Sequence, residues 1–228
     1  MKSLRTLILL ISLVMYAGEF ANAQDWPNLA RFKEENAKLG LPAAGEKRIV
    51  FMGNSITQCW SDSDPDFFKG RPYINRGISG QTTPQMLIRF RQDVISLNPA
   101  VVVILAGTND IAGNTGPSTL EMIVDNISSM AELARVHGIK VIICSVLPAF
   151  DYPWKPGLKP NQKIPALNTM LKKYADDNGF AYLDFFAAMV GEKNGMKKDL
   201  TYDGVHPTLA GYKVMEPMVE EAIAVALK

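Results

Sequence analysis

Short hydrophobic runs alternate along this chain with longer stretches in which hydrophobic residues recur every three or four positions. The short runs predict strands, because β-branched and aromatic residues favour extended backbone. Five candidate strands stand at 48–52, 73–77, 101–105, 141–147 and 181–185. The run at 101–105, Val-Val-Val-Ile-Leu, has no polar position, which is typical of a strand buried on both faces of a sheet.

The longer stretches have helical spacing and predict helices at 30–39, 84–97, 119–137, 164–178 and 207–227. The stretch 119–137 ends on His137-Gly138, which is a helix stop signal. Strands that alternate with helices indicate parallel strands joined by right-handed crossovers. We therefore expect a single α/β domain over residues 24–228, a three-layer α/β/α sandwich around a parallel sheet of about five strands.

The first residues follow a different pattern, which predicts a signal peptide over 1–23. Lys2 and Arg5 give a positive start, an apolar run covers 7–16, and Ala-Asn-Ala at 21–23 has the form of a cleavage site. A membrane anchor is the alternative, but the run is shorter than the roughly 20 residues of a spanning helix. We expect export to the periplasm or beyond, with no stable membrane insertion once the leader is removed.

Composition and charge change this picture little. The 228 residues hold 24 Lys+Arg and 23 Asp+Glu without a basic block, so nucleic acid is not an expected partner. Two cysteines, Cys59 and Cys144, permit a disulfide in an oxidising compartment. Cys144 lies in an apolar run, however, and we expect two free thiols. The sequence leaves the oligomeric state open.

Candidate chemistry begins directly after the first predicted strand. In parallel sheets, functional residues lie in the loops beyond the carboxyl ends of the strands. Ser55 follows Gly53 there and opens a helical stretch, so its hydroxyl can face out beside N–H groups that favour negative charge. Serine is also a good helix cap, and taken alone Ser55 would be read as one.

Two further strand ends offer hydrogen-bond donors. The loop after the second strand holds Gly77 and Gly80, and the Gly77 N–H is a candidate oxyanion donor, although a plain turn also explains these glycines. Asn109 follows the most apolar strand within Gly-Thr-Asn-Asp at 107–110. Its amide can complete an oxyanion hole, unless the motif is a turn with a structural carboxylate at Asp110.

The last candidate group is Asp203-Gly-Val-His206 before Pro207. The chain has two histidines, of which His137 ends a helix. Asp203 stands three residues before His206, a spacing that lets its carboxylate reach the imidazole Nδ1–H while Nε2 accepts a proton from a serine. The alternative is a solvent loop with an Asx turn. The order Ser, Asp, His along a chain is a known triad arrangement.

Together, these groups resemble the SGNH (GDSL-type) hydrolase family of lipases, acylhydrolases and esterases. Its signature residues are Ser, Gly, Asn and His on separate motifs, and the matches lie at 53–55, Gly77, 107–110 and 203–206. They span residues 48–211. Asn54 stands where many members have Asp, which weakens the literal motif but touches none of the four signature residues.

The resemblance implies a flavodoxin-like α/β/α fold and a serine esterase. Ser55 would be the nucleophile, His206 the general base and Asp203 the residue that orients the histidine. The Ser55 N–H, the Gly77 N–H and the Asn109 amide would form the oxyanion hole. No cofactor is expected, and the histidines and cysteines have no zinc-ligand spacing.

Substrate clues come from a Pro-rich loop at 148–160. Tyr152 and Trp154 can stack on a sugar ring or anchor the loop to the body, and the sequence favours neither. No large apolar lid is evident, which favours a small acyl group on a polar alcohol. Since exported members of the family often deacetylate carbohydrates, the resemblance implies a carbohydrate O-acetylesterase for small-molecule or oligosaccharide esters. The alternatives are a lysophospholipase or thioesterase for longer acyl chains, and a catalytically silent carbohydrate-binding protein.

Overall fold

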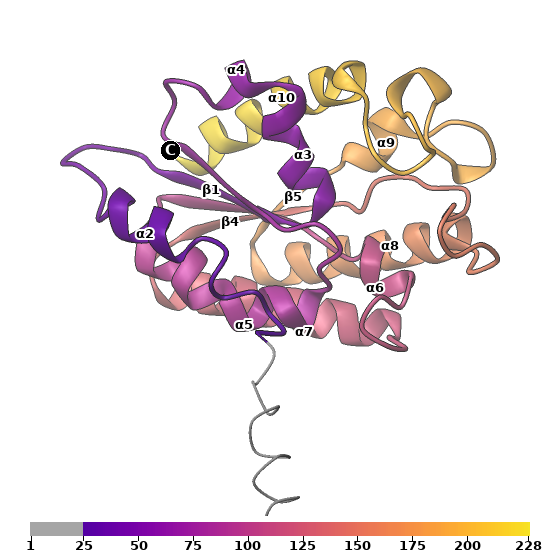
Figure 1. Ribbon diagram of the computed structural model, residues 1–228, viewed down its shortest axis with the longest axis horizontal. Coiled ribbons are helices and arrows are strands. Elements are labelled where there is room, and N and C mark those ends of the chain that lie inside the picture. The colour runs from indigo at the N-terminus through magenta and orange to yellow at the C-terminus, as the bar shows by residue number, and fades with distance from the viewer. Residues whose placement is uncertain (1–24) are drawn as a thin grey trace, which may run out of the picture.

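A five-stranded parallel sheet forms the centre of the protein (Figure 1). The computed structural model describes residues 25–228, so the leader predicted at 1–23 lies outside the described residues. The strand order is β2-β1-β3-β4-β5. The strands are β1 (Ile49–Gly53), β2 (Tyr73–Gly77), β3 (Val101–Leu105), β4 (Lys140–Cys144) and β5 (Ala181–Leu183).

Helices cover both faces of this sheet (Figure 1). One layer holds α5 (Thr83–Asp93), α7 (Leu120–Val136) and α8 (Pro160–Asn178). The other holds α3 (Ser55–Ser63), α4 (Pro65–Phe68), α9 (Phe185–Met189) and α10 (Leu209–Ala226). Shorter pieces are α2 (Lys33–Leu39), α6 (Thr108–Ile111) and the 3₁₀ turns Ile95–Leu97, Glu192–Asn194 and Lys198–Leu200. The predicted three-layer α/β/α sandwich is confirmed.

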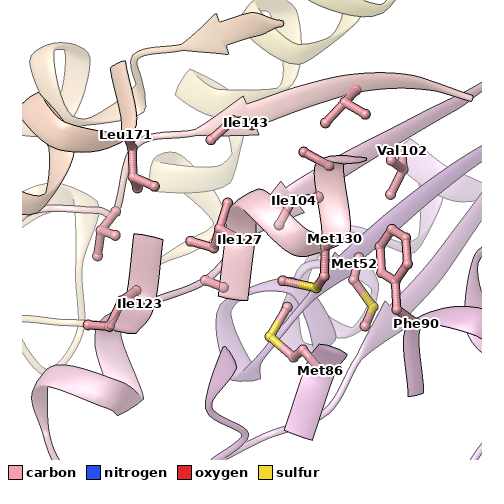
Figure 2. Close-up of a cluster of buried hydrophobic side chains, with 14 of the residues drawn as sticks. Met52, Met86, Phe90, Val102, Ile104, Ile123, Ile127, Met130, Ile143 and Leu171 are labelled. Carbon is pink, nitrogen blue, oxygen red and sulfur yellow. The ribbon is translucent and has the colours of Figure 1, made fainter. Parts of the chain in front are cut away.

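Successive strand residues pack into different layers, because side chains alternate between the faces of a sheet. Val102 and Ile104 of β3 face the layer of α5, α7 and α8, where they meet residues such as Phe90 and Ile127 (Figure 2). Val101 and Val103 face the opposite layer. All five β3 residues are buried, so the prediction from the unbroken apolar run is confirmed.

Three strands end level at one edge of the sheet. Gly53, the last residue of β1, pairs with Gly77 at the end of β2 and with Leu105 at the end of β3. The loops that leave these strands therefore emerge side by side. This register brings the segments that carry Ser55, Gly80 and Asn109 to one place.

The fourth strand is shorter than predicted. It ends at Cys144, although the apolar run continues to Leu147. The Asn168 side chain explains this end, because it accepts a hydrogen bond from the Val146 N–H (2.8 Å) and donates one to the Val146 carbonyl (2.9 Å). A side chain thus replaces the next strand partner, and the backbone turns away from the sheet.

The sequence predicts two free thiols and no stable membrane insertion of the mature chain. Cys59 and Cys144 are both free, as expected. Among the described residues 25–228, no helix combines the length and apolar character that crossing a membrane requires.

Candidate active site

Ser55 is the first residue of α3, immediately beyond β1. The cap of this helix is the preceding residue, since the Asn54 side chain accepts a hydrogen bond from the Ile56 N–H (3.2 Å). The turn is tight: a Cβ added at Gly53 would lie 1.9 Å from Thr57 Oγ1. Because Asn54 takes the capping role, the Ser55 hydroxyl is left for other partners.

That hydroxyl lies against the loop before α10. Ser55 Oγ is 2.9 Å from His206 Nε2, and His206 Nδ1 is 2.6 Å from Asp203 Oδ2. The second carboxylate oxygen, Asp203 Oδ1, accepts the backbone N–H groups of Val205 (2.9 Å) and His206 (2.7 Å). The structure therefore brings three sequence-predicted residues into one chain of hydrogen bonds, in which Ser55 and His206 are 151 positions apart in the sequence.

The same contacts set the charge of Asp203. Its partial burial acts to raise the pKa, but the hydrogen bonds from the His206 N–H, the His206 imidazole and the Val205 N–H outweigh it and lower the pKa. The carboxylate is therefore ionised at neutral pH. An ionised acceptor at Nδ1 favours the tautomer in which Nδ1 carries the proton and Nε2 is free to accept one from Ser55.

Asn109 is buried at the start of α6. One N–H of its amide donates to the Gln81 carbonyl (2.9 Å), and no second acceptor for this amide occurs among the described residues. The neighbouring Asp110 accepts the Thr83 N–H (2.9 Å) and hydroxyl (2.6 Å), which ties α6 to the first turn of α5. The motif thus contains both a structural carboxylate and an amide that retains one free donor.

Gly77, which the sequence predicts as an oxyanion donor, has its N–H in another hydrogen bond. Its N–H already donates to Asn75 Oδ1 at 2.8 Å. Glycine is required here for another reason, because an added Cβ would lie 2.2 Å from the Gln58 backbone nitrogen in α3. Gly77 lets the helix that carries Ser55 approach β2 closely.

Gly80, further along the same loop, is a better candidate than Gly77 for an oxyanion donor. Its φ of 78° suits glycine, and its N–H has no acceptor within residues 25–228. The residues beside it fix the loop: Ser79 N–H donates to Gln58 Oε1 (2.8 Å), and the Gln81 carbonyl accepts from Asn109. Gly80 is therefore held between α3 and Asn109. The sequence interpretation placed Gly80 in this loop but chose Gly77 as the oxyanion donor.

The two aromatic residues of the Pro-rich loop have different environments. Tyr152 is completely buried, so its ring offers no free face to a ligand and takes the anchoring position. Trp154 stacks on it (5.1 Å between ring centres), is 44% exposed and lies 6.1 Å from the His206 ring. Tyr202, which the sequence did not single out, is 66% exposed and stacks against the His206 ring at 5.8 Å.

Residues 51–214, more than two thirds of the chain, match the model of the GDSL-like lipase/acylhydrolase family. The protein belongs to this family. A GDSL-like lipase from Bacteroides thetaiotaomicron is 50% identical, with a TM-score of 0.86 over 88% of this chain and 99% of that one. The matched segment of this GDSL-like hydrolase begins in β1 and ends in α10, so it includes every residue of the site.

Two curated relatives are esterases. Esterase TesA of Pseudomonas aeruginosa is 32% identical, with 80% of this chain and 86% of that protein covered. An acetylxylan esterase of Xylanibacter ruminicola is 26% identical, with 80% of this chain but 45% of that longer protein covered. This GDSL-like hydrolase is accordingly a carboxylic ester hydrolase.

Proposed function

We propose that this hydrolase is an exported carbohydrate O-acetylesterase that works through a triad of Ser55, His206 and Asp203. The observation that carries the triad is the unbroken contact from Ser55 Oγ to His206 Nε2 (2.9 Å) and from Nδ1 to the Asp203 carboxylate (2.6 Å). These are the nucleophile–base and base–orienter contacts of serine hydrolysis.

In the proposed mechanism, Ser55 Oγ attacks the ester carbonyl carbon while His206 Nε2 takes its proton. The resulting tetrahedral oxyanion accepts hydrogen bonds from the Ser55 N–H, the Gly80 N–H and the Asn109 amide. His206 then gives its proton to the leaving alcohol. Water attacks the acyl-Ser55 ester with the help of His206, and acetate leaves as Ser55 regains its proton.

Two observations support an acetylated carbohydrate as the substrate. The chain resembles an acetylxylan esterase over 80% of its length. In addition, the exposed rings of Trp154 and Tyr202 flank His206, and flat aromatic side chains with a polar edge suit contacts with sugar rings. The alternative for longer acyl chains differs from this proposal in its dependence on acyl length. A silent binding protein is disfavoured by the complete hydrogen-bonded chain at Ser55.

Acetate release from acetylated xylan and other acetylated polysaccharides tests this function, with Ser55→Ala as the matched control. Wild-type protein should release acetate and Ser55→Ala should release none while keeping its circular dichroism spectrum. A series of nitrophenyl esters should peak at acetate. A peak at octanoate or longer would replace the acetylesterase with the longer-acyl alternative, and full activity in Ser55→Ala would remove Ser55 from the mechanism.

Export rests on the leader pattern at 1–23. Protein recovered from the periplasm or medium of a producing cell should begin at Gln24. Recovery of exported protein that begins at Met1 would show that the leader is not cleaved there.

A further inference from the structure

A groove of about 910 Å³ lies beside the loop that carries His206. Its walls are the segment 150–156, the turn 191–199, and the residues Asp203 and Gly204. The volume falls within the roughly 300–1,000 Å³ of small-molecule sites in proteins. Asp203 belongs both to the groove and to the chain of hydrogen bonds at Ser55, so the groove borders the candidate active site on the Asp203 side.

Its position relative to the ester follows from the proposed mechanism. His206 must reach the leaving oxygen to protonate it, so the alcohol part of the substrate lies on the His206 side. The acyl oxygen lies on the other side, against Asn109 and the backbone donors. A groove that borders the His206 loop therefore receives the alcohol rather than the acyl chain.

The lining of the groove fits a polar ligand with an apolar face. Phe150 is 53% exposed, and the Lys193 ammonium lies 6.0 Å from its ring centre. Pro153, Pro156 and Met196 add to the apolar part of the lining. The charged side chains in it are Asp151, Glu192, Lys193, Lys197, Lys198 and Asp199. A sugar ring can pack on Phe150 and the other apolar residues while its hydroxyls hydrogen-bond to the charged side chains.

The wall that faces Phe150 is a turn in a strained conformation. Lys193 (φ 53°) and Asn194 (φ 60°) are consecutive left-handed residues, a conformation that persists only where contacts hold it and that clusters at ligand clamps. Asn161 holds this turn, because it donates to the Lys193 carbonyl (3.3 Å) and accepts from the Asn194 amide (3.0 Å). Gly195 lets the turn close onto Phe150, since an added Cβ would lie 3.1 Å from Phe150 Cβ.

We propose that this groove is a subsite for the sugar units next to the acetylated one, with Phe150 as its stacking platform. The substrate is then an acetylated oligosaccharide or polysaccharide chain rather than an acetylated monosaccharide. This assignment rests on the proposed carbohydrate esterase function and adds the length of the sugar chain as a determinant of specificity.

The test compares wild type, Phe150→Leu and Phe150→Trp on acetylated xylose, xylobiose and xylotetraose, and on 4-nitrophenyl acetate. The wild-type kcat/KM should rise with sugar length. Phe150→Leu should lose roughly threefold to tenfold on the longer sugars through KM, because the flat ring is gone, and Phe150→Trp should keep the rise. The Phe150→Leu loss should be smaller on acetylated xylose and on 4-nitrophenyl acetate, which have no further sugar unit to place in the groove, and circular dichroism checks that the variants are folded. Ile88→Ala, an exposed apolar change on α5, serves as the control and should match wild type.

Two results would overturn the assignment of the groove as a sugar subsite and leave the carbohydrate esterase function in place. One is equal wild-type kcat/KM on acetylated xylose and xylotetraose. The other is a Phe150→Leu defect that grows with acyl length from 4-nitrophenyl acetate to octanoate, which would make the groove an acyl pocket. Hydrolysis of 4-nitrophenyl acetate without acetate release from any sugar would instead overturn the carbohydrate esterase function, and the subsite with it.

Discussion

At the scale of single residues, the Asn109 amide has one N–H in a structural hydrogen bond and one for the proposed oxyanion hole. One N–H fixes the loop through the Gln81 carbonyl, and the other is free for an oxyanion. Asn109→Ala should therefore lower kcat by roughly a hundredfold or more and change KM little, as for other oxyanion donors. Steady-state kinetics on 4-nitrophenyl acetate measure this. An unchanged kcat would exclude Asn109 from the oxyanion hole.

The pH dependence of the rate is a second prediction at this scale. His206 must be unprotonated to accept the Ser55 proton, so kcat/KM should fall as the pH is lowered from about 8 to 5, because an imidazolium cannot act as a general base. The lowered pKa of Asp203 keeps its carboxylate ionised over this range, so the fall reports on His206. A flat profile would contradict the assignment of His206 as the base.

The lowered pKa also gives Asp203 a role in stability with a defined sign. A carboxyl whose folded pKa lies below its unfolded value stabilises the fold above the unfolded value, here 3.8, and that contribution is lost as the pH falls further. The contribution is therefore complete at neutral pH, where the enzyme is expected to work.

At the scale of elements, the contact between α3 and β2 positions Ser55, the proposed nucleophile. Gly77→Ala would place a Cβ 2.2 Å from the Gln58 nitrogen, so α3 must shift and carry Ser55 with it. Both the melting temperature and kcat should fall. Gly45→Ala is the control, because its Cβ meets nothing within 4 Å and its φ of 82° adds backbone strain alone. If kcat of Gly77→Ala equals that of wild type, the close approach does not position Ser55.

A buried ion pair joins the strand ends beneath the site. Arg89 Nη2 donates to the Gly53 carbonyl (3.0 Å) and the Arg76 carbonyl (2.9 Å), while Nη1 lies 3.1 Å from Asp93 Oδ2. Burial lowers the pKa of Arg89 to about 10, so the guanidinium is charged at neutral pH. The pair holds the ends of β1 and β2 together at the edge from which Ser55 and Gly80 emerge.

Removal of one partner of the Arg89–Asp93 ion pair should lower the free energy of unfolding more than removal of both partners. Arg89→Met leaves the Asp93 carboxylate buried without its cation and should lower the free energy of unfolding by about 3–5 kcal/mol. The double variant with Asp93→Leu should be less destabilised than the sum of the two single variants, because no unpaired buried charge remains. Urea unfolding of all four proteins measures this, and strict additivity would refute the coupling.

At the scale of the whole molecule, the hydrophobic pattern predicted the architecture because period-2 and helical spacings are local properties of the chain. The layers, the parallel sheet and the burial of β3 all follow from them. The end of β4 does not, since it depends on Asn168, which lies 22 positions away from Val146. Strand and helix identities are thus local, whereas their ends depend on side chains from other elements.

The same distinction explains the site. Ser55, Asn109 and His206 could be predicted because each stands in a short motif at the end of an element. The choice between Gly77 and Gly80 could not, because it depends on which N–H is already bonded and on which glycine faces α3. Burial of Tyr152 likewise depends on the path of the loop over the body, which the local sequence does not encode.

Ser55 is the nucleophile of the proposed mechanism, and His206 activates it. Mass spectrometry after incubation with a fluorophosphonate probe measures this directly. Wild-type protein should carry one phosphonyl adduct on the peptide that contains Ser55, Ser55→Ala should carry none, and His206→Ala should react far more slowly because Nε2 is missing. An adduct on another residue, or no adduct on folded wild-type protein, would contradict the central claim.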